Sequence, residues 1–168
     1  MSTDPTFTAR ASTVNTGDLY KVFTAPYGKQ GILFKQLNPS AEIPRLGTAV
    51  AAGYDLATPS FVGFNPGERK VIKLGFALAL PSDLHGRIES RSSLALKGMV
   101  VLTGVIDADY RGELMVIMQN FGSQYFEFVP GDRVAQLVLR QTVHRSFVPV
   151  DTLEDTDRGV GGFGSTGQ

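Results

Sequence analysis

The 168-residue sequence contains no cysteine, which excludes disulfides, thiolate zinc sites and a cysteine nucleophile. It has no excess of either charge, because 16 Lys and Arg balance 16 Asp and Glu. That balance argues against a protein that coats nucleic acid, although a small phosphorylated ligand needs only a local cluster of cations. No apolar run is long enough to span a bilayer or to form the core of a signal peptide. We therefore expect an intracellular protein, cytoplasmic or nuclear, that is not secreted and has neither a membrane nor a nucleic-acid partner.

The sequence has very few helical patterns. The 19 glycines and 9 prolines favour turns, and short β-like runs recur between them. Residues 31–37, 71–80, 86–90, 99–102, 112–120, 125–129 and 133–139 are the best strand candidates. The one helix candidate, 92–97, is one or two turns long and is preceded by serines suited to capping it. The length fits one domain, and the pattern predicts an all-β sandwich, jelly roll or barrel.

The chain ends differ from this central region. Residues 1–18 are rich in Ser, Thr and Ala without apolar periodicity, so we expect a flexible tail. Residues 19–150 are expected to form a single β-barrel domain, with 39–47 as a loop and 143–150 as a strand-like stretch. Residues 151–168 turn polar and then glycine-rich, which predicts an arm outside the core.

The arm combines groups suited to a nucleotide. Five glycines between 159 and 167 let backbone N–H groups approach an anion. Arg158 adds a planar cation, Ser165 and Thr166 add donors, and Phe163 offers a face for a base. A disordered glycine-rich tail has the same composition, and local sequence alone favours that interpretation. The Gly-Lys-Ser/Thr of a phosphate-binding loop is absent.

Four further segments contain candidate functional residues, and each also has a purely structural interpretation. A hairpin at 104–112 holds Asp107 and Asp109, and one of the two would be well placed as a general base. Asp-containing turns are nonetheless common. Arg91 between serines is an anion-site pattern, or simple helix capping. At 52–55 a glycine that we interpret as a turn residue precedes Asp55, and 131–136 is a turn that enters a strand.

Together these segments resemble the five motifs of trimeric dUTP pyrophosphatases, in the family's order. The motifs are AAGYDL at 51–56, GRIESRSSLA at 86–95, GVIDADYRG at 104–112, PGDRVAQL at 130–137 and RGVGGFGSTG at 158–167. The resemblance implies a distorted jelly-roll-like β-barrel with at most one short helix. It also implies a homotrimer with shared active sites that hydrolyses dUTP to dUMP and pyrophosphate.

The resemblance assigns roles at the nucleoside end of the substrate. Asp107 matches the catalytic aspartate that positions and deprotonates the attacking water. Tyr110 matches the tyrosine that packs under deoxyribose and excludes a 2′-hydroxyl. The backbone of Gly104, Val105 and Ile106 matches the hairpin that hydrogen-bonds the uracil edge.

The resemblance also assigns roles at the phosphate end of the substrate. Arg91, Ser92 and Ser93 match the phosphate-contacting motif, and Gln136 the glutamine near the α-phosphate. Arg158, Ser165 and Thr166 match the arm residues that hold the γ-phosphate, Phe163 matches the ring that stacks on uracil, and Gly164 completes this set of arm contacts. Asp55 matches an acid that reaches Mg²⁺ through water, the metal being held mainly by the triphosphate and water, as its octahedral preference allows.

One departure bears on specificity. The family usually has Ala-Pro before Arg-Ser-Gly, whereas here Glu89 and Ser90 precede Arg91, and Ser93 follows Ser92. Arg-Ser-Ser is also similar to the related dCTP deaminases, so a deaminase-like or bifunctional enzyme is one alternative. A nucleotide-binding regulatory protein on the same fold is another. The intact 107–110 segment and Arg158 favour the dUTPase.

Overall fold

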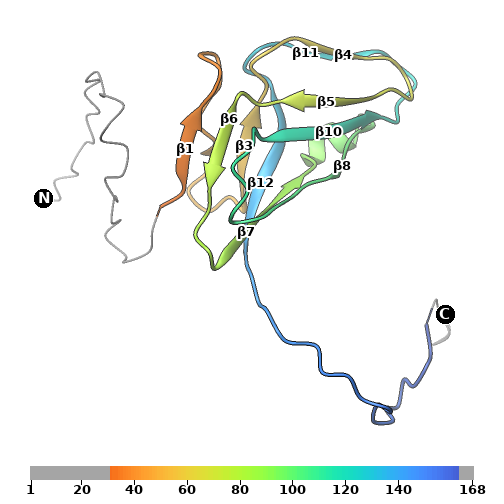
Figure 1. Ribbon diagram of the computed structural model, residues 1–168. Helices are drawn as coiled ribbons and strands as arrows, with labels where there is room; N and C mark the ends of the chain where they lie inside the picture. The colour runs from red at the N-terminus through yellow and green to blue at the C-terminus, as the bar shows by residue number, and fades with distance from the viewer. Residues whose placement is uncertain (1–30, 163–168) are drawn as a thin grey trace, which may run out of the picture.

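The computed structural model describes residues 31–162 as a β-stranded body from which an extended C-terminal segment departs (Figure 1). One short helix, α1 (Ser92–Ala95), interrupts the strands. The strands are β1 (Leu33–Gln36), β2 (Arg45–Leu46), β3 (Gly53–Ala57), β4 (Val62–Phe64), β5 (Arg69–Lys73), β6 (Phe76–Ala79), β7 (Leu84–Glu89), β8 (Met99–Thr103), β9 (Val105–Ile106), β10 (Met115–Asn120), β11 (Phe126–Phe128) and β12 (Arg133–Gln141). None of the helical structure in 31–162 is long and apolar enough to cross a bilayer. The all-β prediction is confirmed.

All strand pairings in this body are antiparallel. The largest sheet has the order β2-β3-β12-β7-β9, and a second has the order β5-β10-β8. Two strand pairs, β1-β6 and β11-β4, complete the jelly-roll-like arrangement. β12 is central because it pairs with both β3 and β7, so its side chains share faces with residues from both neighbours.

The core follows from strand periodicity. In β10 the buried residues are Val116, Met118 and Asn120, with more accessible residues between them. β12 departs from this alternation, because Val134 and Ala135 are both buried. A register shift between Arg133 and Ala135 explains this, since a bulge turns two successive side chains towards the same face.

The apolar run at 71–80 forms two strands instead of one long strand. Gly75 separates β5 from β6 and has φ of 75°, a conformation that L side chains rarely adopt. Its carbonyl oxygen accepts hydrogen bonds from the N–H groups of Leu37 and Asn38, at 2.8 and 2.9 Å. The glycine break noted in the sequence therefore changes the chain direction and fixes the loop after β1.

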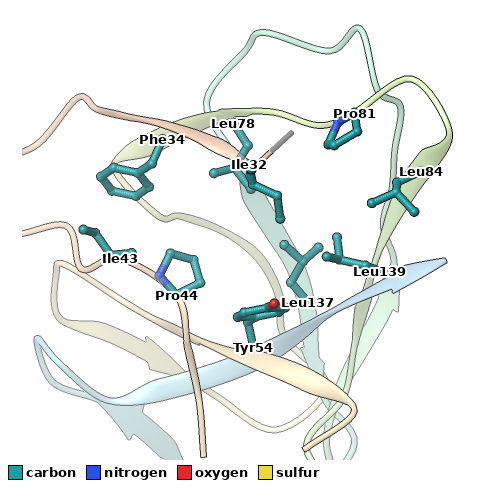
Figure 2. Close-up of a pocket in the computed structure, with 11 residues that line it drawn as sticks. Ile32, Phe34, Ile43, Pro44, Tyr54, Leu78, Pro81, Leu84, Leu137 and Leu139 are labelled. Atoms are coloured by element: carbon teal, nitrogen blue, oxygen red, sulfur yellow. The ribbon is translucent and has the colours of Figure 1, made fainter. Parts of the chain in front are cut away.

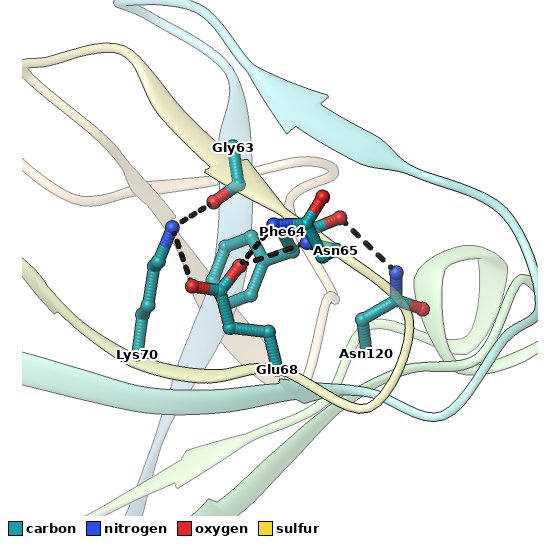
Figure 3. A network of polar contacts seen from close by, with 6 residues as sticks. All are labelled: Gly63, Phe64, Asn65, Glu68, Lys70 and Asn120. Atoms are coloured by element: carbon teal, nitrogen blue, oxygen red, sulfur yellow. Dashed lines mark hydrogen bonds and ion pairs between the residues drawn. The ribbon is translucent and has the colours of Figure 1, made fainter.

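A polar network holds the connection between β4 and β5 (Figure 3). The Glu68 carboxylate accepts the Asn65 backbone N–H at 2.8 Å and pairs with Lys70 Nζ at 3.0 Å. The Asn65 hydrogen bond, helped by Lys70, lowers the pKa of Glu68 below its ordinary value. Nearby, the buried amide of Asn120 donates to the carbonyls of Phe64 and Gln124 at 3.3 and 2.8 Å, so its burial is compensated.

The helix is present, but its predicted serine cap is wrong. Arg91 is the N-cap residue, with extended backbone angles and no side-chain capping bond. The Ser90 hydroxyl instead accepts the backbone N–H of Val101 in β8 at 2.8 Å. The serine thus connects the start of the helix to β8. The pairing of β8 with β10 has a register shift in this region.

Three other differences concern strands. β2 lies within the expected loop 39–47, and β3 and β4 were not predicted. The stretch 143–150 forms no strand, because a strand needs a paired neighbour and none lies beside it among the described residues. The predicted turn at 130–132 is confirmed, with Gly131 at φ of 90° and Asp132 N–H donating to Val129 O at 3.0 Å.

Candidate functional site

The hairpin motif lines a surface cleft of about 390 Å³. Five residues that the sequence singled out lie along it: Gly104, Val105, Ile106, Asp107 and Tyr110. The rest of its lining comes from β5, β10 and the loop before β10, namely Val71, Glu113, Met115 and Ile117. This hairpin cleft has mainly apolar walls with two acids, Asp107 and Glu113, and the phenol of Tyr110, which suits a flat base joined to a sugar.

The cleft wall is held closely against β7. Ile106 pairs with Gly86 and Val105 with Arg87, while Ile88 N–H donates to Gly104 O at 2.7 Å. A Cβ on Gly104 would lie 2.8 Å from the Ile88 Cβ, so only glycine allows this approach. The backbone that faces the cleft is therefore fixed before any ligand binds.

Asp107 begins a tight turn. Tyr110 N–H donates to Asp107 O at 3.1 Å, and Arg111 Nη1 donates to the carbonyls of Ala108 and Tyr110 at 2.7 and 2.9 Å. The Asp107 side chain is exposed, and within residues 31–162 its carboxylate has no hydrogen bond or ion pair. Its acceptors are available to a water molecule. Sequence reasoning missed Arg111, although its place inside the hairpin motif was a usable signal.

Tyr110 is also held in place. Its hydroxyl donates to Glu113 O at 3.2 Å, and its ring lies over Gly112, where a Cβ would collide with it. The ring is thereby presented along the cleft wall, next to the turn that carries Asp107. Such a surface can pack against a sugar but offers no donor or acceptor to an additional hydroxyl there.

The second constellation is an arginine cluster around one carboxylate. Asp55 Oδ1 pairs with Arg91 Nε at 3.1 Å, and Asp55 Oδ2 pairs with Arg133 Nη1 at 3.2 Å. Arg91 Nη1 also donates to Arg133 O at 3.0 Å. The carboxylate therefore orients two guanidinium groups, a geometry suited to binding phosphate oxygens. Arg133 was not predicted as a site residue, because within its motif it was interpreted as part of a turn.

Gln136 lies beside this cluster. It faces Asp55 in β3 and Glu89 in β7, and its Nε2 donates to Ser90 O at 3.0 Å. A Cβ on Gly53 would lie 2.9 Å from Gln136 Oε1. Gly53 is therefore a strand glycine that makes room for the amide, and the interpretation of it as a turn residue is wrong.

Glu89, the unusual acid before Arg91, has cationic partners of its own. Its Oε1 lies 3.1 Å from Arg87 Nε and 3.8 Å from Arg140 Nη2. These pairs offset its charge on the sheet. The departure from the family pattern thus leaves Arg91 free of competition from Glu89 for its ion pair.

The described chain does not bring the predicted site together in one place. The hairpin cleft and the arginine cluster share no lining residue. Ser92 and Ser93 are exposed at the helix start, and Arg158 bonds only within its own segment, donating from Nε to Gly161 O at 3.0 Å. Phe163, Gly164, Ser165 and Thr166 lie outside the described residues, as does the tail 1–18.

No group of three metal-ligating side chains occurs in 31–162. Asp55, the residue matched to a magnesium contact, instead contacts two guanidinium groups. A carboxylate has about four acceptor positions, so two pairs leave room for a water. The residues present therefore fit an outer-sphere contact to a metal held by other ligands and do not fit an all-protein cage.

Another cavity, of about 400 Å³, lies between the β1-β6 pair and the largest sheet (Figure 2). Ile32, Phe34, Leu78, Leu137 and Leu139 point into it with other mainly apolar side chains. None of its lining residues within 31–162 is charged, so these residues are not suited to binding a triphosphate. The hairpin cleft and arginine cluster remain the candidate site.

Comparisons with known proteins point to one family. The sequence model described as dUTPase matches residues 39–167. The mouse deoxyuridine 5′-triphosphate nucleotidohydrolase is 44% identical over 136 residues, covering 80% of this chain and 84% of that one. The structure of the Staphylococcus bacteriophage 80alpha dUTPase with dUPNHPP aligns with a TM-score of 0.77 at 28% identity, over 82% of this chain and 99% of that one. A mutant dUTPase of S. aureus phage phi11, described with a structural Mg(II) ion, aligns with a TM-score of 0.70 at 25% identity, over 74% and 99%.

The fold and the matched motifs define the class first: an all-β, jelly-roll-like nucleotide hydrolase. Within that class the chain belongs to the dUTPase family, since the family match spans most of its length.

Proposed function

We propose that this chain hydrolyses dUTP to dUMP and pyrophosphate. The observation that carries the proposal is the hairpin cleft, where the Asp107 carboxylate, which has no partner among residues 31–162, and the Tyr110 ring stand beside the fixed backbone of Gly104 to Ile106. The arginine cluster supplies the charge that a triphosphate needs. The mouse and phage relatives, named for deoxyuridine triphosphate hydrolysis or solved with dUPNHPP, support the same substrate.

Base and sugar bind before chemistry. The backbone of residues 104–106 hydrogen-bonds the uracil edge, and the ring of Tyr110 packs under the deoxyribose. A ribose hydroxyl pressed against this ring would lose water without gaining a partner, which disfavours UTP. Phe163 of the arm closes over the base by stacking.

Asp107 then acts as the general base. Its carboxylate orients a water molecule and takes its proton as the water oxygen attacks the α-phosphorus, and pyrophosphate leaves in line. Arg91 and Gln136 hold the α-phosphate side, while Arg158 with Ser165 and Thr166 hold the γ-phosphate. Cations that are already oriented lower the barrier because they need not reorganise as charge develops. Mg²⁺, when bound to the triphosphate and touching Asp55 through water, supplies further charge neutralisation.

The proposed assembly is a homotrimer in which three chains complete each site. The support is the separation of the parts within one chain: among the described residues, the hairpin cleft, the arginine cluster and Arg158 share no lining residue, hydrogen bond or ion pair. The division into tail, barrel and C-terminal arm (151–168) belongs to the same proposal.

The test is pyrophosphate release from dUTP, dCTP, dTTP and UTP, with ammonia release from dCTP measured in parallel. We expect turnover of dUTP alone. Asp107→Asn keeps the shape but not the basicity, so turnover should fall about 10²–10⁴-fold while dUTP still binds. Tyr110→Ala should increase UTP turnover relative to dUTP. Ammonia from dCTP, or more than a few per cent of wild-type turnover in Asp107→Asn, would contradict the proposal.

A further inference from the structure

Strand register aligns four polar residues in one row across the largest sheet. Arg45 of β2 pairs with Asp55 of β3, Asp55 pairs with Gln136 of β12, and Gln136 pairs with Glu89 of β7. Directly paired residues present their side chains on the same face of a sheet. Arg45 therefore stands on the face of the arginine cluster, although it lies outside the five motifs.

A cavity of about 210 Å³ lies beside this row. It lies against β2, β3 and the start of β12, and its charged lining residues are Glu42, Arg45, Asp55 and Arg133. Unlike the apolar cavity of Figure 2, it has guanidinium groups in its wall and adjoins the arginine cluster through Asp55.

The four charged residues that line this cavity balance formally, and Arg91, which pairs with Asp55, adds a third arginine beside them. Both Asp55 oxygens are already paired, one with Arg91 and the other with Arg133. Arg45 has no ion pair or hydrogen bond to any described residue, and Glu42 forms no salt bridge with it. Counted with Arg91, which lies outside the lining, three arginines stand against the carboxylates of Asp55 and Glu42, so this group of five residues has one formal positive charge. A local excess of planar cations suits a phosphate chain.

From this arrangement we infer that Arg45 is a further substrate-binding residue, which contacts the distal phosphates of the triphosphate. The inference rests on the proposed function, because Gln136 is assigned there to the α-phosphate. Arg45 lies two strands from Gln136 along the row, roughly 10 Å away at ordinary strand spacing. Arg45 thus stands at the β2 end of the row, two strands away from the residue assigned to the reacting phosphate. Asp55 lies between them and orients Arg91 and Arg133.

The test measures binding of the phosphate chain separately from binding of the rest of the nucleotide. Binding of inorganic tripolyphosphate and of dUMP is measured by calorimetry for the wild type, Arg45→Gln, Arg45→Glu and Arg69→Gln. Arg69 is a matched control: it is an exposed arginine on β5, bonded to Gln119 at 3.0 Å in the other sheet. Melting temperatures establish that each variant is folded.

We expect Arg45→Gln to weaken tripolyphosphate binding and raise the KM for dUTP about tenfold, the loss of one charge-assisted hydrogen bond. Arg45→Glu should lose more, and dUMP binding should stay at the wild-type level in both. Unchanged tripolyphosphate binding in both Arg45 variants, or an equal loss of dUMP binding, would overturn the inference. If the wild type fails to hydrolyse dUTP, the proposed function is wrong, while the tripolyphosphate measurement still decides the role of Arg45 in anion binding.

Discussion

The β-stranded body and the extended segment at 143–162 contain similar apolar residues but differ in how far those side chains are exposed (Figure 1). In the body, Leu114 is 0% exposed, whereas in the segment Phe147 and Val160 are 101% and 107% exposed. Both regions have runs that resemble strands in sequence. The difference teaches that a β-like run becomes a strand only where another strand offers its backbone groups. A segment with so much uncovered apolar surface is suited to contact a second molecule.

Removing residues 158–168 should have the largest effect on activity and the smallest on the fold. The deletion removes a cation and several donors proposed for the γ-phosphate, so turnover of dUTP should fall about a hundredfold or more. Because Arg158 bonds, in the described part of the chain, only within its own segment, the melting temperature should hardly change. Steady-state kinetics and thermal unfolding measure both quantities. A large fall in melting temperature would instead make the arm part of the folded body.

A matched pair of leucines tests the difference between the body and the segment through the free energy of unfolding. Leu114 in the body is fully buried, and Leu153 in the segment is 86% exposed. Leu114→Ala should lower the free energy of unfolding by about 2–5 kcal/mol, since it leaves a cavity. Leu153→Ala should change it by less than about 0.5 kcal/mol. Denaturant titrations provide the comparison, and similar losses for the two variants would remove the distinction between the regions.

The smallest expected effect concerns the polar network of Figure 3. The folded-state pKa of Glu68 is lowered by the Asn65 N–H and by Lys70, so the ionised form stabilises the fold. This contribution is present above the ordinary pKa of a glutamate and is lost as pH falls through the lowered folded value. Glu68→Gln should therefore be slightly less stable than the wild type at pH 7, and the gap should close at pH 3. A gap that widens on acidification would contradict this assignment.

Local sequence predicted much of the body, because alternation and turn residues act over a few positions. The 130–132 turn, the break at Gly75 and the short helix all depend on neighbouring residues. β3 and β4 escaped prediction, since Gly53 and Gly63 have poor strand propensity and these strands form through pairing with β12 and β11.

The residues of the candidate site likewise fall into those that a local motif indicates and those that only the structure reveals. The motifs indicated Asp107, Tyr110 and Gln136 as candidates, whereas Arg133 gains its significance from its ion pair with Asp55 and Arg45 from its register with Asp55. Arg133 is 78 residues away from Asp55 in sequence, and no local pattern carries that relation. The role of Gly53 was misread for the same reason, because the side chain that needs its space belongs to Gln136 on another strand.

The central claim is that one active site takes Asp107 and the arm from different chains. The most direct test mixes two inactive variants, Asp107→Asn and a truncation before Arg158, which are unfolded together and refolded at a 1:1 ratio. If the claim is right, about a quarter of the sites in randomly mixed trimers receive an intact copy of both parts, and dUTP turnover returns to about that fraction of wild type. Turnover that stays at the level of the separate variants, in trimers shown by mass spectrometry to be mixed, would contradict the shared site.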